Sequence, residues 1–295
     1  MNIALYSRQP SADGIALIEE MIGYLRQSKV NIILHEAISD LVKKNVLTYC
    51  KGTFISKEDL VDQHTDFLFS IGGDGTFIDA ANLMEDGNIP ILGINTGRIG
   101  FLTNVNKQNY QMAFQLLQSG DYQLENRFLL HIDTPNSNII QHHFALNDIS
   151  IHPSGDSINA IHVWANGEKL NTYWGDGLIV ATPTGSTAYS LSCGGPILVP
   201  SSDVIVLTPI ASHSLTVRPI VLPANYELTL QIESRSHQFV LSMDAQRTTL
   251  EDTTILLISK EKFTIPTVRL SHTDFYSVIR EKLLWGIDLR NISKI

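Results

Sequence analysis

The stretch Phe67-Leu68-Phe69-Ser70-Ile71-Gly72-Gly73-Asp74-Gly75-Thr76 decides how the first part of this chain folds. It begins with an apolar run, and Phe77, Ala80, Ala81 and Met84 after it recur at helical spacing, so the pattern predicts a strand, a glycine loop and a helix. Glycines let backbone N–H groups approach a phosphate, and a helix start presents unpaired donors and a positive dipole end to an anion. The loop is therefore a candidate phosphate-binding site.

Asp74 stands in the middle of this loop. A carboxylate repels phosphate unless it holds a cation or accepts a proton from an attacking hydroxyl, and both roles belong to phosphoryl transfer. The alternative is that Asp74 is a turn residue among turn glycines. These residues alone leave both interpretations open.

The segments around the loop alternate between strand-like and helix-like patterns. Strands are predicted at 2–7, 30–34 and 89–94, and helices at 15–25 and 110–117, the second closed by Gly120. Alternating strands and helices imply a mainly parallel sheet, in which ligands bind beyond the carboxyl ends of the strands. The glycine loop lies at such an end.

From about Leu124 the pattern changes to closely spaced strands. Segments such as 128–132, 178–182 and 204–207 are strand-like, Asn166-Gly167 is a hairpin signal, and 226–232 alternates as a half-buried strand does. A helical pattern returns only at 275–283, with Asp274 as its N-cap and Gly286 as its stop.

These patterns predict an α/β plus all-β architecture in two domains. Residues 1–123 and 271–295 are expected to form an N-terminal Rossmann-like α/β domain that carries the glycine loop, with the C-terminal helix returning to it. Residues 124–270 are expected to form a β-rich, β-sandwich-like domain.

The composition excludes several classes of protein. The chain has 295 residues, 43% hydrophobic and 17% charged, which suffices for a large core and two domains. A net charge of -9 gives no basic surface for nucleic acid. No apolar stretch could span a bilayer and no signal peptide is visible, so we expect no membrane partner and a cytoplasmic location. Cys50 and Cys193 lack disulfide spacing and are expected to be buried thiols.

A second polar region lies in the β-rich half. Trp174-Gly175-Asp176-Gly177 precedes a short apolar strand and then Thr182-Pro183-Thr184-Gly185-Ser186-Thr187-Ala188-Tyr189-Ser190. Hydroxyls and exposed amides suit the ribose and ring nitrogens of a nucleotide, and Tyr189 offers an aromatic face. The alternative is an ordinary Ser/Thr loop. Ser186 as a hydrolase nucleophile is less favoured, because the G-x-S-x-G pattern is absent.

Asn147-Asp148 falls at a strand end. An amide beside a carboxylate can bridge adenine and ribose hydroxyls, or it can form an Asx-turn, and the sequence leaves both open.

These motifs occur in a fixed order from roughly residue 66 to the C-terminus: Gly72 to Thr76, Gly93 to Asn95 running to Gly100 to Thr103, Asn147-Asp148, Gly175 to Gly177 through Gly194-Gly195-Pro196, Arg218 to Pro223, Asp244-Ala245-Gln246, and Phe275 to Leu284. In this order they resemble the NAD kinase family. The glycine-aspartate motif also resembles loops of lipid kinases and phosphofructokinases, whereas the long block from Asp176 to Pro196 resembles NAD kinases alone.

The resemblance implies transfer of the terminal phosphoryl group of ATP to the 2'-hydroxyl of the adenosine ribose of NAD, giving NADP. Asp74 would be the base or polarising group that faces this hydroxyl, and Asp176 would serve the nicotinamide end, across a subunit interface. The other nucleotide-binding residues that the resemblance implies are Gly72, Gly73, Gly75, Thr76, Phe101, Asn147, Asp148, Thr184, Gly185, Ser186, Thr187, Ala188, Tyr189, Ser192 and Gln246.

The resemblance also implies a divalent metal, magnesium, that arrives with ATP, NAD as substrate, and a homo-oligomer, either a dimer or a tetramer. No metal ligands are expected among the side chains. Asp148 stands where many members have Glu, and its shorter side chain reaches less far. Ala245 replaces a usual glycine and would strain the turn if its φ were positive.

Two other functions share parts of this pattern. A lipid or sugar kinase could be built around the same loop, and a non-enzymatic dinucleotide sensor could keep the binding loops without chemistry. The carboxylate in the loop argues against the sensor, because a pure phosphate binder gains nothing from it.

Overall fold

The computed structural model describes residues 1–97, 100–135, 143–155, 159–271 and 274–286. The chain divides into two compact units, unit 1 with Met1–Asn126 and Ile265–Ile295 and unit 2 with Arg127–Thr264. These limits differ by a few residues from the predicted ones at 123 and 271. The end of the predicted first domain, 287–295, lies outside the described residues.

Unit 1 is built on a parallel sheet, as the alternating pattern predicts. Its central strands follow the order β5-β4-β1-β2-β3, and every neighbouring pair is parallel. The strands are β1 (Asn2–Tyr6), β2 (Asn31–His35), β3 (Gly52–Phe54), β4 (Phe67–Gly72), β5 (Ile91–Asn95) and β6 (Val105–Asn106), joined by the last residues of β18 (Leu256–Leu270).

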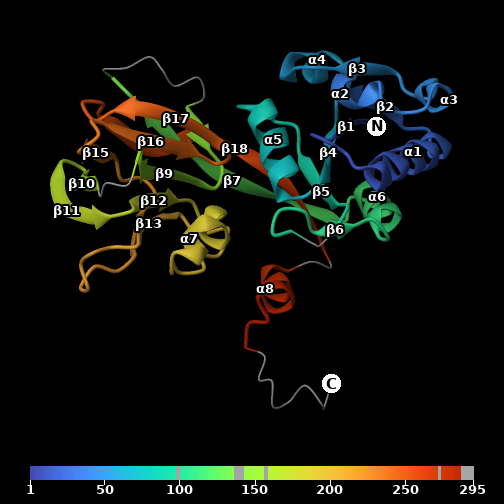
Figure 1. The fold of residues 1–295 in the computed structure, drawn as a ribbon. Coiled ribbons are helices and arrows are strands. Elements are labelled where there is room, and N and C mark those ends of the chain that lie inside the picture. Colours follow the sequence, from blue (N-terminus) through green and yellow to red (C-terminus); the bar gives the residue numbers. More distant parts are fainter. Residues whose placement is uncertain (98–99, 136–142, 156–158, 272–273, 287–295) are drawn as a thin grey trace. The chain divides into compact units, whose positions relative to one another are not determined.

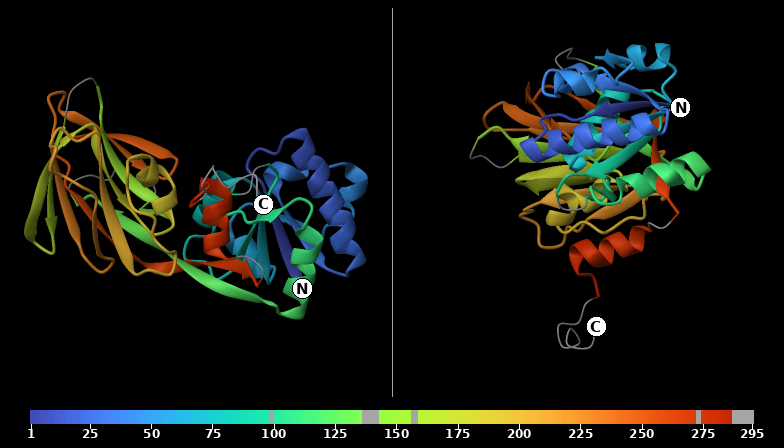
Figure 2. Two further views of the ribbon diagram at one scale, coloured as in Figure 1. Left: turned by 90° about the horizontal axis from the view of Figure 1, so that it is seen from below. Right: turned by 90° about the vertical axis from the view of Figure 1, so that its right-hand side faces the viewer.

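Helices cover both faces of this sheet. On one face α1 and α6 pack over a core that includes Ile3, Phe69 and Ile94, and they lie in front of the strands in the right-hand view of Figure 2. On the other face α5 packs against β4 and β5 (Figure 1). The helices are α1 (Ala12–Gln27), α2 (Glu36–Ser39), α3 (Lys44–Leu47), α4 (Lys57–Asp62), α5 (Asp74–Met84), α6 (Tyr110–Ser119) and α8 (Phe275–Leu283).

The ends of the predicted helices are mostly where the sequence indicates. Gly120 closes α6 in the left-handed conformation, with φ 77°. Asp274 caps α8 by accepting a hydrogen bond from the Ser277 N–H at 2.9 Å. The predicted stop at Gly286 is wrong, because Leu284 already adopts a left-handed φ of 52° and ends the helix at Leu283. Within the described ranges no helix is long and apolar enough to cross a membrane.

Unit 2 consists of two sheets packed on one core, as the predicted β-sandwich requires. One has the order β14-β13-β12-β9-β16-β17, and the other includes β11-β10-β15-β18 and β7-β8. Leu130, Ile161, Leu178 and Leu241 come from both sheets and belong to the same apolar cluster. The strands are β7 (Tyr122–Asp133), β8 (Phe144–Ala145), β9 (Asp148–Pro153), β10 (Asn159–Ala165), β11 (Glu168–Gly175), β12 (Gly177–Ala181), β13 (Val204–Ile210), β14 (Ile220–Pro223), β15 (Leu228–Glu233), β16 (Gln238–Met243) and β17 (Gln246–Glu251).

Two local predictions in unit 2 are confirmed. Asn166 and Gly167 have φ values of 50° and 80°, as a type I′ turn between β10 and β11 requires. Strand β15 alternates between buried and more exposed residues. The hydroxyl-rich segment, in contrast, is not a loop throughout, since it contains the short helical turns η1 (Gly185–Thr187) and α7 (Tyr189–Ser192).

Candidate active site

The glycine loop of unit 1 joins the carboxyl end of β4 to the start of α5. Gly72 is required by the chain itself, because a Cβ there would lie 2.3 Å from the Thr76 hydroxyl oxygen. Gly73 and Gly75 are different: a Cβ at either position would meet nothing within 4 Å, and Gly73 has an ordinary extended φ of -99°. The fold therefore does not require glycine at 73 or 75. Because both residues are glycine, there is open space beside their backbone N–H groups.

The Asp74 carboxylate is held by the segment 101–103. Oδ2 accepts a hydrogen bond from the Phe101 N–H at 2.8 Å, while Oδ1 accepts from the N–H groups of Leu102 and Thr103 at 3.1 Å and from the Thr103 hydroxyl at 2.9 Å. A Cβ on Gly100 would lie 1.7 Å from Oδ1, so glycine is required there. With three donors on Oδ1 and one on Oδ2, the oxygen with acceptor capacity left is Oδ2.

Two buried polar side chains support this arrangement. The Asn95 amide Nδ2 donates to the Thr103 hydroxyl oxygen at 2.7 Å, and the Asn95 Oδ1 accepts from the Gly97 N–H at 2.7 Å. Asn95 and Thr103 are 3% and 0% exposed, so water does not compete for these bonds. Neither residue was predicted as a site residue, although both stand in the motif that carries the resemblance.

A similar arrangement holds the Asn147-Asp148 turn of unit 2. The Asp244 carboxylate accepts hydrogen bonds from the backbone N–H groups of Leu146, Asn147 and Asp148 at 2.8–3.2 Å. Asp244 itself has a positive φ of 50°, while Ala245 does not, so the strain considered for Ala245 is absent. The sequence motif contained Asp244 but gave no indication of this positioning role.

Asp148 is a carboxyl group in an unfavourable place for a charge. The residue is 7% exposed and starts β9. Burial, together with the nearby negative charge of Asp244, raises the pKa of its side chain to about 7. Near neutral pH it can therefore donate as well as accept a hydrogen bond.

The turn after β12 packs directly against this region. The Thr182 hydroxyl donates to the Leu146 carbonyl at 2.6 Å, and the Thr182 N–H donates to the Asn147 carbonyl at 2.9 Å. A Cβ on Gly185 would lie 2.0 Å from the same Asn147 carbonyl. Gly185 is therefore required for the two turns to touch.

Ser186 is a structural residue in this arrangement. It is 0% exposed, and its hydroxyl donates to the Pro183 carbonyl at 2.6 Å while accepting from the Leu198 N–H at 3.0 Å. This engaged, inaccessible hydroxyl gives no support to a hydrolase nucleophile.

The remaining predicted residues of this segment differ in accessibility: Thr184 is buried, Thr187 and Ala188 are half-buried, and Tyr189 and Ser192 are exposed. The Thr187 hydroxyl donates to the Thr184 carbonyl, and the Thr184 hydroxyl accepts from Arg127 at 3.4 Å. Tyr189 is 41% exposed and its ring stacks on that of His152, with centroids 5.9 Å apart. Ala188 and Ser192 flank it at the ends of α7.

Asp176 lies apart from this group within unit 2. It is exposed and precedes β12, whereas the hydroxyl-rich turn follows β12. Six steps of about 3.4 Å each lead from Asp176 to Thr182, roughly 20 Å along the strand. Gln246 is half-buried and pairs with Met243 in the turn that contains Asp244.

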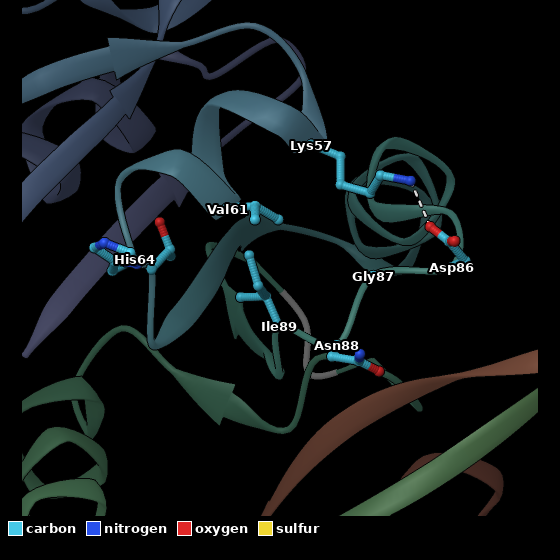
Figure 3. A pocket seen from close by; sticks show the side chains of 8 residues that line it. Lys57, Val61, His64, Asp86, Gly87, Asn88 and Ile89 are labelled. Atoms are coloured by element: carbon cyan, nitrogen blue, oxygen red, sulfur yellow. Dashed lines mark hydrogen bonds and ion pairs between the residues drawn. The ribbon is translucent and has the colours of Figure 1, made fainter.

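A separate cavity of about 520 Å³ lies in unit 1 at the opposite edge of the sheet (Figure 3). Its lining includes Thr65 and Ile89, which precede β4 and β5, and none of the predicted site residues. The Lys57 ammonium there is already paired with Asp86 and Glu85. Among the described residues no group of three His, Cys, Asp or Glu could hold a metal ion.

The chain thus combines an α/β unit, which carries a glycine loop with a fixed carboxylate, and a β-sandwich-like unit. Models of two protein families match the chain: the ATP-NAD kinase N-terminal domain at residues 24–122 and the ATP-NAD kinase C-terminal domain at residues 146–270. This chain belongs to the ATP-NAD kinase family.

Curated relatives and solved structures agree with this membership. The chain is 37% identical to the NAD kinase of Cytophaga hutchinsonii over 99% of its own length and 100% of that protein, and 38% identical to that of Flavobacterium psychrophilum over the same shares. A crystal structure of yeast NADH kinase complexed with NADH has a TM-score of 0.85 at 28% identity, covering 98% of this chain and 89% of that one. An NAD kinase from Archaeoglobus fulgidus has the same fold, with a TM-score of 0.73 at 23% identity over 96% and 99% of the two chains.

Proposed function

We propose that this protein is an enzyme that phosphorylates NAD to NADP, transferring the terminal phosphoryl group of ATP to the 2'-hydroxyl of the adenosine ribose. The observation that carries the proposal is the Asp74 carboxylate, fixed by four hydrogen bonds beside two glycines whose Cβ positions face open space. Family membership supports NAD and ATP as ligands, and a yeast relative was crystallised with NADH. The matches support neither a lipid or sugar kinase nor a non-enzymatic sensor.

Asp74 acts through Oδ2, which accepts a hydrogen bond from the 2'-hydroxyl and draws off its proton as the phosphoryl group is transferred. Gly72, Gly73, Gly75 and Thr76 line the path of the ATP phosphates, and their N–H groups with the start of α5 stabilise the negative charge. A divalent metal, magnesium, would be held mainly by the ATP phosphates and would neutralise charge on the transferred phosphoryl group.

The β-rich domain, 124–270, binds the dinucleotide. The Asn147-Asp148 turn recognises the adenine side together with Thr184, Thr187, Ala188, Tyr189 and Ser192, and Phe101 and Gln246 complete the nucleotide contacts. The buried residues Gly185 and Ser186 shape this surface. Asp176 serves the nicotinamide end across a subunit interface of a dimer or tetramer, which its position apart from the other residues supports.

The protein works in the cytoplasm. Cys50 and Cys193 are unpaired, as is usual in reducing compartments, although both are half-buried and not buried as expected. Fractionation of cells that express the tagged protein tests this placement.

The decisive experiment follows NADP formation from NAD, ATP and magnesium by the wild type and by Asp74→Asn. We expect the variant to keep NAD binding and to lose turnover by a factor of about 10² to 10⁴, the usual contribution of a general base. Near-normal turnover would remove Asp74 from the mechanism. Phosphorylation of diacylglycerol or a sugar phosphate without NAD would identify a different kinase, and NAD binding without turnover under any donor would indicate a sensor.

A further inference from the structure

Arg8 lies at the same sheet edge as the glycine loop. Strands β1 and β4 are parallel, with Tyr6 opposite Ser70. β1 ends at Tyr6 and β4 at Gly72, so Arg8 follows the same end of the sheet from which the glycine loop leaves. Among the described residues within two positions of the carboxyl ends of β1, β4 and β5, Arg8 is the one cation.

The side chain of Arg8 is directed to α5, the helix that begins at the glycine loop. Its Nη1 lies 3.1 Å from Oδ2 and 3.4 Å from Oδ1 of Asp79. Asp79 stands five residues after Asp74, in the second turn of α5. The guanidinium is therefore held on the second turn of α5, roughly 7.5 Å along the helix axis from Asp74, at the end of the helix that the proposed function assigns to phosphate.

A simple surface ion pair does not explain this arrangement well. The Arg8 and Asp79 side chains are 57% and 23% exposed, and exposed ion pairs contribute little to stability. Burial raises the pKa of the Asp79 carboxyl by more than Arg8 lowers it, so the charge at Asp79 is kept at a cost. Tyr6, packed beside it, has its pKa raised to about 12 by burial and by the Asp79 charge.

The ion pair also leaves most of the guanidinium available. Only Nη1 donates to Asp79, and neither Nε nor Nη2 donates to any residue that the structure describes. A guanidinium carries five N–H donors in a rigid fork that matches phosphate oxygens. The Nη1 atom of the guanidinium is fixed by Asp79, and its Nε and Nη2 atoms remain available to a ligand.

We propose that Arg8, positioned by Asp79, binds the phosphate groups of the nucleoside triphosphate donor at the glycine loop. This inference rests on the proposed function and adds to it a side-chain cation for the donor phosphates. Asp74 brings a negative charge to this loop, so a nearby cation offsets its repulsion of the phosphates. Arg8 precedes the region in which the sequence resembles NAD kinases, so the motifs did not predict it.

The test compares the wild type with Arg8→Gln and with Arg26→Gln as a matched control. Arg26 is another unit 1 arginine, whose guanidinium lies 3.7 Å from the centre of the Tyr49 ring, away from the glycine loop. NADP formation is measured against ATP at saturating NAD and against NAD at saturating ATP. For Arg8→Gln we expect the KM for ATP to rise about 10- to 100-fold, the range for a hydrogen bond to a charged group, with the KM for NAD within twofold. Arg26→Gln should match the wild type in both.

A second variant tests the role of Asp79. Asp79→Asn keeps the side-chain shape but removes the charge that fixes Arg8, so we expect a smaller rise in the KM for ATP, about 3- to 10-fold, and none for NAD. Far-UV circular dichroism and thermal melting establish that each variant is folded.

Several outcomes would overturn the inference. One is an active Arg8→Gln with a wild-type KM for ATP, and another is a rise confined to the KM for NAD. If the wild type makes no NADP, the proposed function is rejected. Calorimetric titration with a non-hydrolysable ATP analogue then tests separately whether Arg8 binds the donor phosphates. Weaker analogue binding by Arg8→Gln than by Arg26→Gln then supports the inference, and equal binding rejects it.

Discussion

The two oxygens of the Asp74 carboxylate are not equivalent, and Thr103 is the reason. Its N–H and its hydroxyl both donate to Oδ1, and the same hydroxyl accepts from Asn95. Oδ1 is thereby saturated, and the carboxyl group is fixed in rotation. A fixed carboxylate can be aligned with a substrate hydroxyl without first being ordered. Thr103 is thus a positioning residue for Asp74.

Replacing Thr103 tests this role. We expect Thr103→Val, which keeps the shape but removes the hydroxyl, to lower kcat about 10-fold or more while the KM for NAD changes less than threefold. Thr103→Ser restores the hydroxyl and should recover most of kcat. Steady-state kinetics of both variants provide the measurement. An inactive Thr103→Ser, or a fully active Thr103→Val, would contradict the positioning role.

At the scale of elements, α5 and α1 each contain a glycine with open space around it, Gly75 in the first turn of α5 and Gly23 inside α1. Gly75 in α5 and Gly23 in α1 are both helical, and a Cβ at either would meet nothing within 4 Å. Alanine is the better helix former by up to about 1 kcal/mol. Gly75 belongs to the glycine loop, whereas Gly23 does not.

Alanine at these two positions separates stability from function. We expect Gly75→Ala and Gly23→Ala both to fold and to melt at or slightly above the wild-type temperature. Only Gly75→Ala should lose activity, with kcat/KM for ATP reduced about 10-fold or more, because the methyl group would occupy the space in which we propose that phosphate binds. Equal activity of the two variants would mean that no ligand approaches Gly75 closely.

For the molecule as a whole, Asp148 makes stability depend on pH. Its pKa is about 7 in the folded chain and about 3.9 when unfolded, so between these values the folded state binds more protons. The contribution of Asp148 to the free energy of unfolding therefore falls as the pH rises from about 4 to 7, and it stays constant above pH 7. The difference of about three pKa units corresponds to roughly 4 kcal/mol.

Asp148→Asn removes this dependence. We expect the melting temperature of the variant minus that of the wild type to be larger at pH 8 than at pH 5. Calorimetry at matched ionic strength provides the measurement. Asp176→Asn changes an exposed carboxylate of the same unit and serves as the control, for which the difference from wild type should not vary between the two pH values. A pH-independent difference for Asp148→Asn would show that Asp148 is ionised throughout.

The sequence predicted those features that depend on local pattern. Helical spacing located α1 and α6, the Asn166-Gly167 pair located a turn, and the glycine motif located the junction of β4 and α5. It did not predict contacts between residues far apart in the chain, such as Asp244 with the 146–148 turn or Arg8 with Asp79. Such contacts follow from strand order and register, which no local periodicity specifies. The end of α8 was missed because a leucine adopted the conformation expected of glycine.

The two carboxylates that hold backbone segments have a consequence for the entropy of binding. Asp74 and Asp244 each fix three consecutive N–H groups, at 101–103 and at 146–148. Ordering a residue of backbone costs about 1–2 kcal/mol, and here that cost falls on folding instead of on association. Under the proposed function, a nucleotide would bind loops whose backbone these hydrogen bonds already order. Their amide hydrogens should exchange slowly with solvent before any nucleotide is added.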